Sequence, residues 1–347
     1  MGVGFGVLAG STLQAIALQN KEGKFIMPTW LPFKGILIKQ DLGSKSKTHK
    51  TQRKNNFNPE LLISKNEITV LSNQWKRLAN QEQDLTASAF LIHLDNQKYA
   101  QLEPEKTLSA ASSIKIPILL VTLKLVDLGQ ISWNEKLRLE KKLIGGGAGW
   151  MAYQPLKTKF PIHEVATEMI RVSDNTATNL LIERIGGKKI LNDHFNQLGL
   201  YSTSVNNLMP DLAGTNTTSA QDLVRAIAMV DEGNLLSPRA RDLFREVLST
   251  SITNRLLPGG FLRGLGIENE KIDENLQIKG YRIYNKTGDI GIAYSDAGLI
   301  QMPDNTRAVA GFIVEGPFND PRSPELIRRM AQSLVPYLKP PIKSLEK

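Results

Sequence analysis

The stretch SSIKIPILLVTLKLVDL, residues 112–128, is the most apolar run of the chain, and Gly129 follows it directly. The run is too long for an ordinary strand, and its apolar residues would cover nearly every face of a helix. We therefore predict a central helix that is buried on all sides. Pro117 fits this prediction because it falls near the start of the helix, where a missing backbone N–H costs little.

Two elements are predicted before this helix. Residues 67–82 have the spacing of an amphipathic helix, with apolar side chains at Val70, Leu71, Trp75 and Leu78. Two alternating runs, Ala87–Leu94 and Lys98–Leu102, flank the turn residues Asp95-Asn96, which is the pattern of a β-hairpin. The folded part of the chain is thus expected to begin with a helix and two antiparallel strands.

The sequence after the central helix predicts a helical middle and a closing group of strands. Residues 145–149, GGGAG, are a loop, and the further elements are helices at 162–184, 219–232 and 324–338 and strands at 281–286, 294–301 and 307–315. A sheet assembled from both ends of the chain, with an all-helical subdomain inserted between, satisfies this order. We predict an α+β fold whose sheet is mainly antiparallel.

The formal charge of +9 is concentrated near the N-terminus. Residues 21–65 carry ten Lys/Arg and three Asp/Glu, a net charge of +7, so the rest of the chain is close to neutral. We interpret this segment as a basic, disordered tether and predict no binding to nucleic acid. The uncharged residues 1–20 are predicted to be a signal or membrane-anchor segment. Residues 66–340 then form the folded domain.

Composition excludes several classes of chemistry. The chain has no cysteine, so disulfides, thiol catalysis and cysteine metal ligands are ruled out. We predict no metal and no other cofactor, because no metal-binding spacing relates the four histidines, His49, His93, His163 and His194. The GGGAG loop lacks the Gly-Lys-Ser/Thr ending of a phosphate-binding loop.

Ser112 and Lys115 are the candidate catalytic pair. The pattern Ser-x-x-Lys places a hydroxyl and an amine one helical turn apart on the same face. A serine hydroxyl needs a neighbouring base, and a lysine can serve when burial lowers its pKa. The pattern occurs twice more, in polar tails where no lysine can be buried, at Ser44/Lys47 and Ser344/Lys347. Ser112 lies at the head of the apolar helix, where free N–H groups can stabilise an oxyanion.

Two further motifs follow this pair along the chain, and each occurs once. Ser173-Asp174-Asn175 lies within RVSDNTATNLLIERIGG. Lys286-Thr287-Gly288 comes later, where we predict the end of a strand and a turn. Either motif alone would be interpreted as a helix cap or a strand-end turn. Three such motifs in this order, each on a suitable element, indicate one shared site.

With these motifs the chain resembles a class A β-lactamase, within the larger group of penicillin-recognising serine enzymes. The resemblance runs from about residue 66 to 338 and includes the SDNTATNLL run and the YQP at 153–155. It implies a β-lactamase/transpeptidase-like fold, no cofactor, and a small β-lactam or a cell-wall peptide as substrate.

The resemblance also implies the catalytic roles. Ser112 would attack the lactam carbonyl and become acylated, with Lys115 as the base for that attack. Ser173 would pass a proton to the departing ring nitrogen. Asp174 would have a structural role as a capping carboxylate.

The substrate-binding roles follow from the same resemblance. Asn175 would hydrogen-bond the side-chain amide of the substrate. Lys286 and Thr287 would bind the substrate carboxylate, a cation and a hydroxyl for one anion. Gly288 would allow close approach of the backbone. The backbone N–H groups of Asp289 and of the nucleophile would form the oxyanion hole.

Four other side chains near the motifs have two interpretations each. Arg255 and Arg263 could also bind the substrate carboxylate, or they could be ordinary surface arginines. Trp150 and Tyr153, which follow the GGGAG loop, could be cleft-wall aromatics or packing residues.

One expected residue is missing from the loop after the Ser-Asp-Asn motif. Class A β-lactamases use a glutamate there to activate the water that hydrolyses the acyl-enzyme. No Glu lies between Glu183 and Glu232, and the corresponding loop, 201–219, has Asp211 as its one carboxylate. Asp211 is the candidate deacylation base, although it is one methylene shorter and also suits the turn after Pro210. We therefore predict an acyl-enzyme that forms readily and turns over slowly.

Two alternatives remain open beside the β-lactamase. A D-alanyl-D-alanine peptidase or esterase on the same scaffold is favoured by the missing glutamate, whereas the single-domain size and the SDNTATNLL run favour the lactamase. A non-catalytic penicillin-binding sensor, tethered through residues 1–60, is the other. In each case we expect a monomer that is exported, periplasmic or membrane-anchored. The basic segment after residues 1–20 argues against export under the positive-inside rule.

Overall fold

The apolar run that begins at Ser112 forms helix α3 (Lys115–Asp127), and the short 3-10 turn η2 (Ala111–Ile114) leads into it. Nearly every side chain of α3 is buried, which confirms the predicted central helix. The helix begins later than predicted because Ser113 hydrogen-bonds the Ala110 carbonyl through its N–H (3.2 Å) and its hydroxyl (2.6 Å), closing a tighter turn. Ser112 therefore lies on the turn ahead of the helix.

A computed structural model describes residues 66–233, 235–268 and 270–338 of the chain. The predicted leader and basic tether, residues 1–65, lie outside the described residues, as do the last two residues of the predicted domain. Within the described ranges no helix is long and apolar enough to cross a membrane.

A six-stranded sheet forms the base of the fold, in the order β1-β3-β2-β10-β9-β8. Every neighbouring pair is antiparallel except β1 with β3. The N-terminal hairpin meets the C-terminal strands where β10 pairs with β2, with Ala310 opposite Leu91. The predicted hairpin, the three later strands and a sheet built from both chain ends are therefore confirmed. The strands are β1 (Asn66–Glu67), β2 (Thr86–His93), β3 (Lys98–Leu102), β8 (Arg282–Asp289), β9 (Ala293–Gln301) and β10 (Arg307–Glu315).

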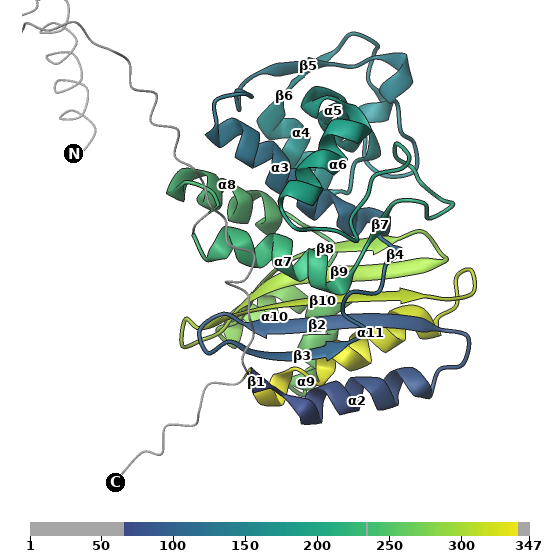
Figure 1. The fold of residues 1–347 in the computed structure, drawn as a ribbon, viewed down its shortest axis with the longest axis vertical. Helices are drawn as coiled ribbons and strands as arrows, with labels where there is room; N and C mark the ends of the chain where they lie inside the picture. The colour runs from purple at the N-terminus through teal and green to yellow at the C-terminus, as the bar shows by residue number, and fades with distance from the viewer. Residues whose placement is uncertain (1–65, 234, 269, 339–347) are drawn as a thin grey trace, which may run out of the picture. The chain divides into compact units, whose positions relative to one another are not determined.

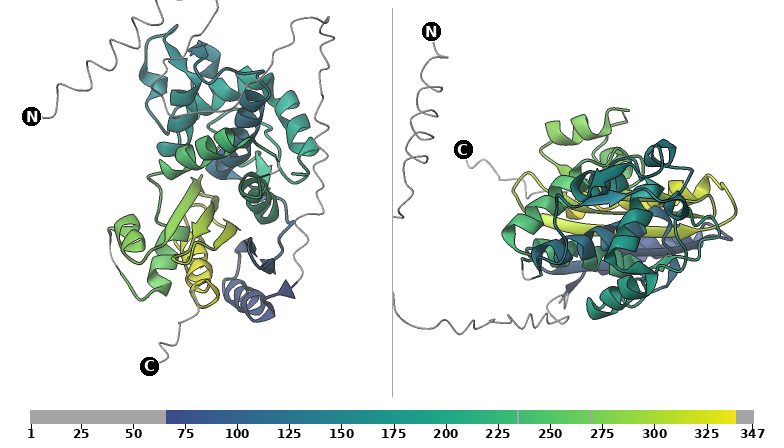
Figure 2. Two further views of the ribbon diagram at one scale, coloured as in Figure 1. Left: turned by 90° about the vertical axis from the view of Figure 1, so that its left-hand side faces the viewer. Right: turned by 90° about the horizontal axis from the view of Figure 1, so that it is seen from above.

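Helices cover both faces of this sheet (Figure 1). On one face α7 lies against the strands, and α3, α4, α5, α6 and α8 complete a helical subdomain with its own hydrophobic core. On the other face α2, α9 and α11 enclose a second core, and the same layers are visible from two further directions in Figure 2. The helices are α2 (Thr69–Asn80), α4 (Ile162–Arg171), α5 (Asn175–Ile185), α6 (Gly187–Gln197), α7 (Ala220–Asp231), α8 (Pro238–Ser249), α9 (Leu257–Gly264), α10 (Ile272–Ile278) and α11 (Arg322–Gln332).

Two small sheets connect the loops around the helical subdomain. One joins β4 (Leu108–Ser109) to β7 (Thr217–Thr218), just before the turn that carries Ser112. The other joins β5 (Lys136–Arg138) to β6 (Lys159–Pro161). The first of these connects the turn that carries Ser112 to the loop 201–219.

The predicted helix at 162–184 is broken into two helices. Helix α4 ends at Arg171 and α5 begins at Asn175. Between them Ser173 takes a left-handed φ of +61°, and the Asp174 carboxylate caps α5 by accepting a backbone N–H at 2.9 Å. The Ser-Asp-Asn motif therefore spans a connecting loop and the start of a helix.

Other boundaries also differ from the prediction. Lys286-Thr287-Gly288 lies inside β8 and is not followed at once by a turn, because the strand continues through Asp289. The closing helix ends at Gln332, and Val335–Tyr337 form a separate 3-10 turn around Pro336. Helices α6, α8, α9 and α10 have no counterpart among the predicted elements.

Candidate active site

Lys115 connects the first two motifs through its side-chain amine. Its Nζ lies 3.0 Å from Ser112 Oγ and 2.9 Å from Ser173 Oγ. The same nitrogen donates to the Ser173 carbonyl at 2.8 Å and to Asn175 Oδ1 at 2.9 Å. The structure thus brings the predicted nucleophile, base and proton relay together around one nitrogen.

The environment of Lys115 favours its neutral form. The side chain is 0% exposed, at the start of the buried helix α3. Burial lowers the pKa of the amine well below its ordinary value, and the positive charge of Lys286 lowers it further, while Asp174 opposes the change. An amine held in this way can accept the proton of Ser112.

Asp174 fixes the loop that carries Ser173. Its buried carboxylate accepts three backbone N–H groups at 2.7–2.9 Å, from Trp150, Met151 and Ala177. Gly149, with a φ of +87°, lies so close that a Cβ there would be 2.1 Å from Asp174 Oδ2. Asp174 has the predicted capping role and also joins the GGGAG loop to the second motif.

Asn175 also connects the GGGAG loop to the site. Its Nδ2 donates to the Gly146 carbonyl at 2.8 Å, and its backbone N–H donates to the Ala148 carbonyl at 3.1 Å. Because its Oδ1 also accepts from Lys115 Nζ, the side-chain amide is held from both ends. The amide therefore has a fixed orientation at the wall of the site.

The third motif lies close to Ser112 on strand β8. Burial lowers the pKa of Lys286 to about 8, and its Nζ donates to the Thr287 carbonyl at 2.5 Å. Gly288 comes so close that a Cβ there would be 2.6 Å from the backbone nitrogen of Ser112. Asp289 ends the strand and is exposed, with its Oδ1 accepting the Gly291 N–H at 2.9 Å. This strand therefore brings a buried cation and the backbone at Gly288 close to Ser112.

Thr287 belongs to a hydrogen-bonded network that motif analysis missed. Its Oγ1 lies 3.0 Å from the Thr253 carbonyl and 3.1 Å from Asp296 Oδ2. Asn285 Nδ2 donates to that same carbonyl and to Asp296 Oδ1, both at 2.8 Å. Asp296 is fully buried on β9, directly opposite Thr287. The available signal was a lone carboxylate inside the apolar strand predicted at 294–301.

One cavity of about 430 Å³ collects most of the predicted site residues. Lys115 reaches this cavity through its contact with Ser112, and the predicted residues that border it directly are Ser112, Ser173, Asn175, Asp211, Lys286, Thr287 and Asp289. The remaining lining residues were not predicted as site residues and are mostly apolar: Ala111, Gly147, Ala148, Val172, Met209, Pro210, Leu212, Thr253 and Ile290. The GGGAG loop thus contributes to the wall of the cleft.

Asp211 borders the cavity, but its carboxylate is already engaged within its own loop. Oδ1 accepts from the Thr215 hydroxyl at 2.8 Å, and Oδ2 accepts from the Asn216 N–H at 2.6 Å. The side chain is 7% exposed. These two hydrogen bonds hold the carboxylate against its own loop.

The four side chains with two interpretations lie in different surroundings. Arg263 pairs with Glu325 at 2.5 Å. Arg255 is exposed and lines a neighbouring cavity of about 370 Å³ that also borders the third motif. Trp150 packs edge-on against Phe160, and its Nε1 donates to the buried Glu168 at 2.7 Å. Tyr153, in contrast, is 79% exposed.

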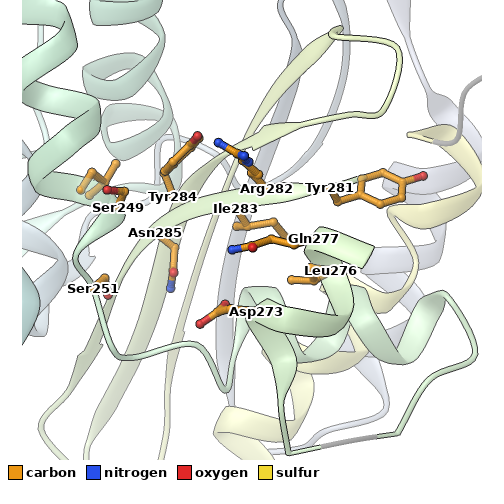
Figure 3. Close-up of a pocket in the computed structure, with 11 residues that line it drawn as sticks. Ser249, Ser251, Asp273, Leu276, Gln277, Tyr281, Arg282, Ile283, Tyr284 and Asn285 are labelled. Carbon is orange, nitrogen blue, oxygen red and sulfur yellow. The ribbon is translucent and has the colours of Figure 1, made fainter. Parts of the chain in front are cut away.

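Another cavity of about 430 Å³ lies between α8, α10 and the edge strand β8 (Figure 3). Polar side chains such as Asp273 and Gln277 line it, but no residue of the three motifs does. Across residues 66–338, apart from 234 and 269, no group of His, Asp or Glu side chains is placed to hold a metal ion. The predicted chemistry therefore belongs to the cavity at Ser112.

Comparison with known proteins agrees with this geometry. The model of the β-lactamase enzyme family matches residues 70–338. The chain belongs to this family. Its class A resemblance is also confirmed, and the fold matches solved β-lactamases such as that of Sphaerobacter thermophilus, with a TM-score of 0.64 at 23% identity over 77% of this chain and 97% of that one.

Individual relatives show how far the similarity extends. The extended-spectrum β-lactamase PER-1 of Pseudomonas aeruginosa is 24% identical over 249 residues, which cover 68% of this chain and 77% of that one. The β-lactamase of Bacteroides uniformis is 25% identical over 52% of this chain, and the match spans 63% of its length. The solved structure of PBP-A is 38% identical, with a TM-score of 0.72, and covers 79% of this chain and 97% of its own. A variant of PBP-A has been solved as an acyl-enzyme complex with penicillin G.

Proposed function

We propose that this protein is a serine hydrolase that opens β-lactam amides through an acyl-enzyme on Ser112. The observation that carries this proposal is the position of Lys115 Nζ, which is fully buried and within 3.0 Å of the hydroxyls of Ser112 and Ser173. A neutral amine at this point can take the proton of one serine and exchange a proton with the other.

The acylation step balances with these groups alone. Ser112 Oγ forms a bond to the lactam carbonyl carbon while its proton moves to Lys115 Nζ. The carbon–nitrogen bond of the lactam then breaks, and Ser173 passes a proton to the departing nitrogen, which Lys115 replaces. The N–H groups of Ser112 and Asp289 stabilise the oxyanion that forms between these steps.

The substrate carboxylate is proposed to bind at Lys286 and Thr287. In the described part of the chain, the Lys286 ammonium has the Thr287 carbonyl as its hydrogen-bond acceptor, so two of its three N–H donors can face an anion. Both residues border the cavity that contains Ser112. A buried cation in a partly apolar cavity favours a ligand that brings the opposite charge.

Slow deacylation is the second part of the proposal. The loop 201–219 has no glutamate, and both oxygens of Asp211 accept hydrogen bonds inside the loop. The loop residues beside Asp211 on the cavity wall are Met209, Pro210 and Leu212, none of which can remove a proton from water. Ester hydrolysis therefore lacks the loop glutamate that class A enzymes use as its base.

The test is the intact mass of the protein after exposure to penicillin G. We expect one added penicillin on the native chain, no addition on Ser112→Ala, and normal addition on Ser113→Ala. Ser113 is the matched control because it is buried next to the nucleophile but hydrogen-bonds the Ala110 carbonyl. Labelling that survives Ser112→Ala would show that the nucleophile is another residue.

A time course after removal of free penicillin tests the deacylation step. We expect the added mass to persist over many minutes, and Asp211→Ala to leave its decay unchanged. Rapid return to the unmodified mass would refute slow turnover. If that return required Asp211, it would identify this residue as the deacylation base.

A D-alanyl-D-alanine peptidase or esterase on this scaffold remains the second candidate, and the engaged carboxylate of Asp211 favours it. A chromogenic cephalosporin and a D-alanyl-D-alanine peptide, assayed side by side, separate the alternatives. Many turnovers of the cephalosporin would establish the lactamase, and turnover of the peptide alone would establish the peptidase. A single stoichiometric burst with neither turnover would indicate a penicillin-binding sensor.

A further inference from the structure

Asp296 is a buried carboxylate that none of the proposed steps uses. It lies on β9 with its side chain fully enclosed, opposite Thr287 on β8. Its Oδ1 accepts from Asn285 Nδ2 at 2.8 Å, and its Oδ2 accepts from the Leu257 N–H at 3.0 Å and lies 3.1 Å from Thr287 Oγ1. Asp296 is therefore in direct contact with a residue that is proposed to bind the substrate carboxylate.

The hydroxyl of Thr287 has a single proton and two acceptors close by. One is the Thr253 carbonyl at 3.0 Å, and the other is Asp296 Oδ2. A carbonyl and an ionised carboxylate offer no proton in return. While Asp296 is ionised, the Thr287 proton is held inside the network, and the oxygen presents its lone pairs to an incoming anion.

Protonation of Asp296 reverses this arrangement. A carboxylic acid can donate to Thr287 Oγ1. The acceptors left for the Thr287 proton are then the neutral Thr253 carbonyl and an anion in the cavity, and the charged acceptor forms the stronger hydrogen bond. The Thr253 carbonyl already receives the Asn285 amide at 2.8 Å, so it does not depend on Thr287. The Thr287 proton is then available to the cavity, which this residue borders.

We propose that Asp296 is a positioning residue that decides whether Thr287 donates its hydroxyl proton to an anionic substrate. The inference rests on the proposed function, in which Lys286 and Thr287 bind the substrate carboxylate. The protonated state of Asp296 favours anionic substrates over neutral ones. By thermodynamic linkage, an anionic substrate also promotes uptake of a proton by Asp296.

The surroundings of Asp296 place this switch at mildly acidic pH. Burial raises its pKa to about 6, against its hydrogen bonds and the charge of Lys286. Lys286 on β8 is the charged group that acts on it, while β10 places Phe312 opposite it. From α11, which also packs on this side of the sheet, Arg328 and Glu325 pair with each other at 2.8 Å. Binding of anionic substrates should therefore strengthen as the pH falls through about 6.

The experiment compares two substrates of the full chain, penicillin G and its methyl ester, between pH 5 and 7, where Lys286 with its pKa of about 8 keeps its charge. The measured quantity is the ratio of their second-order rate constants for acylation of Ser112. Protonation of Lys115 slows both substrates equally and cancels from the ratio. We expect the ratio to rise roughly three- to tenfold as the pH falls from 7 to 5, because one hydrogen bond to the carboxylate is gained.

Two variants separate the proposed role from a structural one. In Asp296→Asn the side chain is uncharged at every pH, so the ratio should lose its step near pH 6 and become independent of pH. In Thr287→Val the hydroxyl is removed without a change of shape, so the ratio should be low and equally independent of pH.

The possible results lead to different conclusions. A wild-type ratio that does not change with pH overturns the inference, as does a pH step that persists in Asp296→Asn or Thr287→Val. If Asp296→Asn does not fold, Thr287→Val still decides the question. Failure of penicillin G to label wild-type Ser112 at any pH would refute the proposed function itself, and the role of Asp296 with it.

Discussion

Lys115 can act as a base only when its amine is neutral, and burial beside the charge of Lys286 lowers its pKa in that direction. We expect the rate constant for acylation of Ser112 to fall as the pH is lowered through the pKa of Lys115, because a protonated amine cannot accept the serine proton. Lys115→Arg stays charged and should acylate at least ~100-fold more slowly, with no such pH dependence. Rates of mass addition by penicillin G across the pH range test this. If Lys115→Arg showed the same dependence of the acylation rate on pH as the native chain, Lys115 would be excluded as the base.

Met209 offers a way to supply the missing deacylation base. Its side chain borders the cavity, and Asn179 fixes its backbone by accepting its N–H at 2.8 Å and donating to its carbonyl at 2.7 Å. Met209→Glu places a carboxylate of similar length on this wall and should speed loss of the acyl group by ~100-fold or more. Met209→Gln is the control, because it has the same shape without a base. Equal decay of the two acyl-enzymes, followed by intact mass, would contradict the prediction.

At the scale of elements, the GGGAG loop and the start of α5 depend on each other. Asp174 accepts the N–H groups of Trp150 and Met151, directly after the loop, and Gly149 leaves no room for a Cβ beside it. Gly149→Ala should displace Asp174 and cost about 1–3 kcal/mol of unfolding free energy, with slower acylation because Ser173 moves too. Gly146→Ala is the matched control, because a Cβ there meets open space. Thermal unfolding of both variants measures the difference, and equal stabilities would show that the close approach is unimportant.

The periodicity of apolar residues predicted the elements whose buried faces follow from their own sequence pattern. The apolar helix α3 and the hairpin of β2 and β3 follow their side-chain patterns closely, because each buries what its pattern indicates. Helix α9 was missed because its sequence, LPGGFLRG, contains poor helix formers. The reason for those glycines is tertiary: a Cβ on Gly260 would lie 2.4 Å from the Arg328 carbonyl of α11. No local pattern reveals such a helix contact.

The candidate site shows the same difference between local sequence patterns, which could be recognised, and tertiary contacts, which could not. The three motifs could be recognised along the chain, and the structure brings Ser112, Lys115 and Ser173 within hydrogen-bonding distance. The role inferred for Asp296 depends on strand register, which places it opposite Thr287. The engagement of Asp211 depends on a turn whose hydrogen bonds close only in the folded loop. The motifs therefore predicted which side chains come together, as well as the cap at Asp174, but not the contacts of Asp296 and Asp211.

At the scale of the whole molecule, the cleft has walls from two parts of the fold. Ser112 and Ser173 come from the helical subdomain and its entry turn, whereas Lys286 comes from the sheet. The six-stranded sheet is completed where the N-terminal hairpin pairs with β10, while β8, β9 and β10 pair with one another. The strand that carries Lys286 is therefore supported by strands from both ends of the described fold.

Trp75 allows this dependence to be measured, because it joins the first described helix to the last. It is fully buried, packs edge-on against Phe312, and donates through Nε1 to Ser333 Oγ at 2.9 Å on the far side of the sheet from the cleft. Trp75→Ala should lower the unfolding free energy by about 3–5 kcal/mol. Val70→Ala, on the same helix but 66% exposed, should change it by no more than about 0.5 kcal/mol. Urea unfolding measures both.

Trp75 touches no cleft residue, so its loss should act on the amount of folded protein and not on the chemistry. At a temperature where Trp75→Ala remains folded, its rate of acylation by penicillin G should match that of the native chain. On warming, acylation should disappear together with the folded signal, because the cleft wall formed by β8 is lost when the sheet opens. Slower acylation in the fully folded variant would instead mean that the second core controls the geometry of the cleft directly.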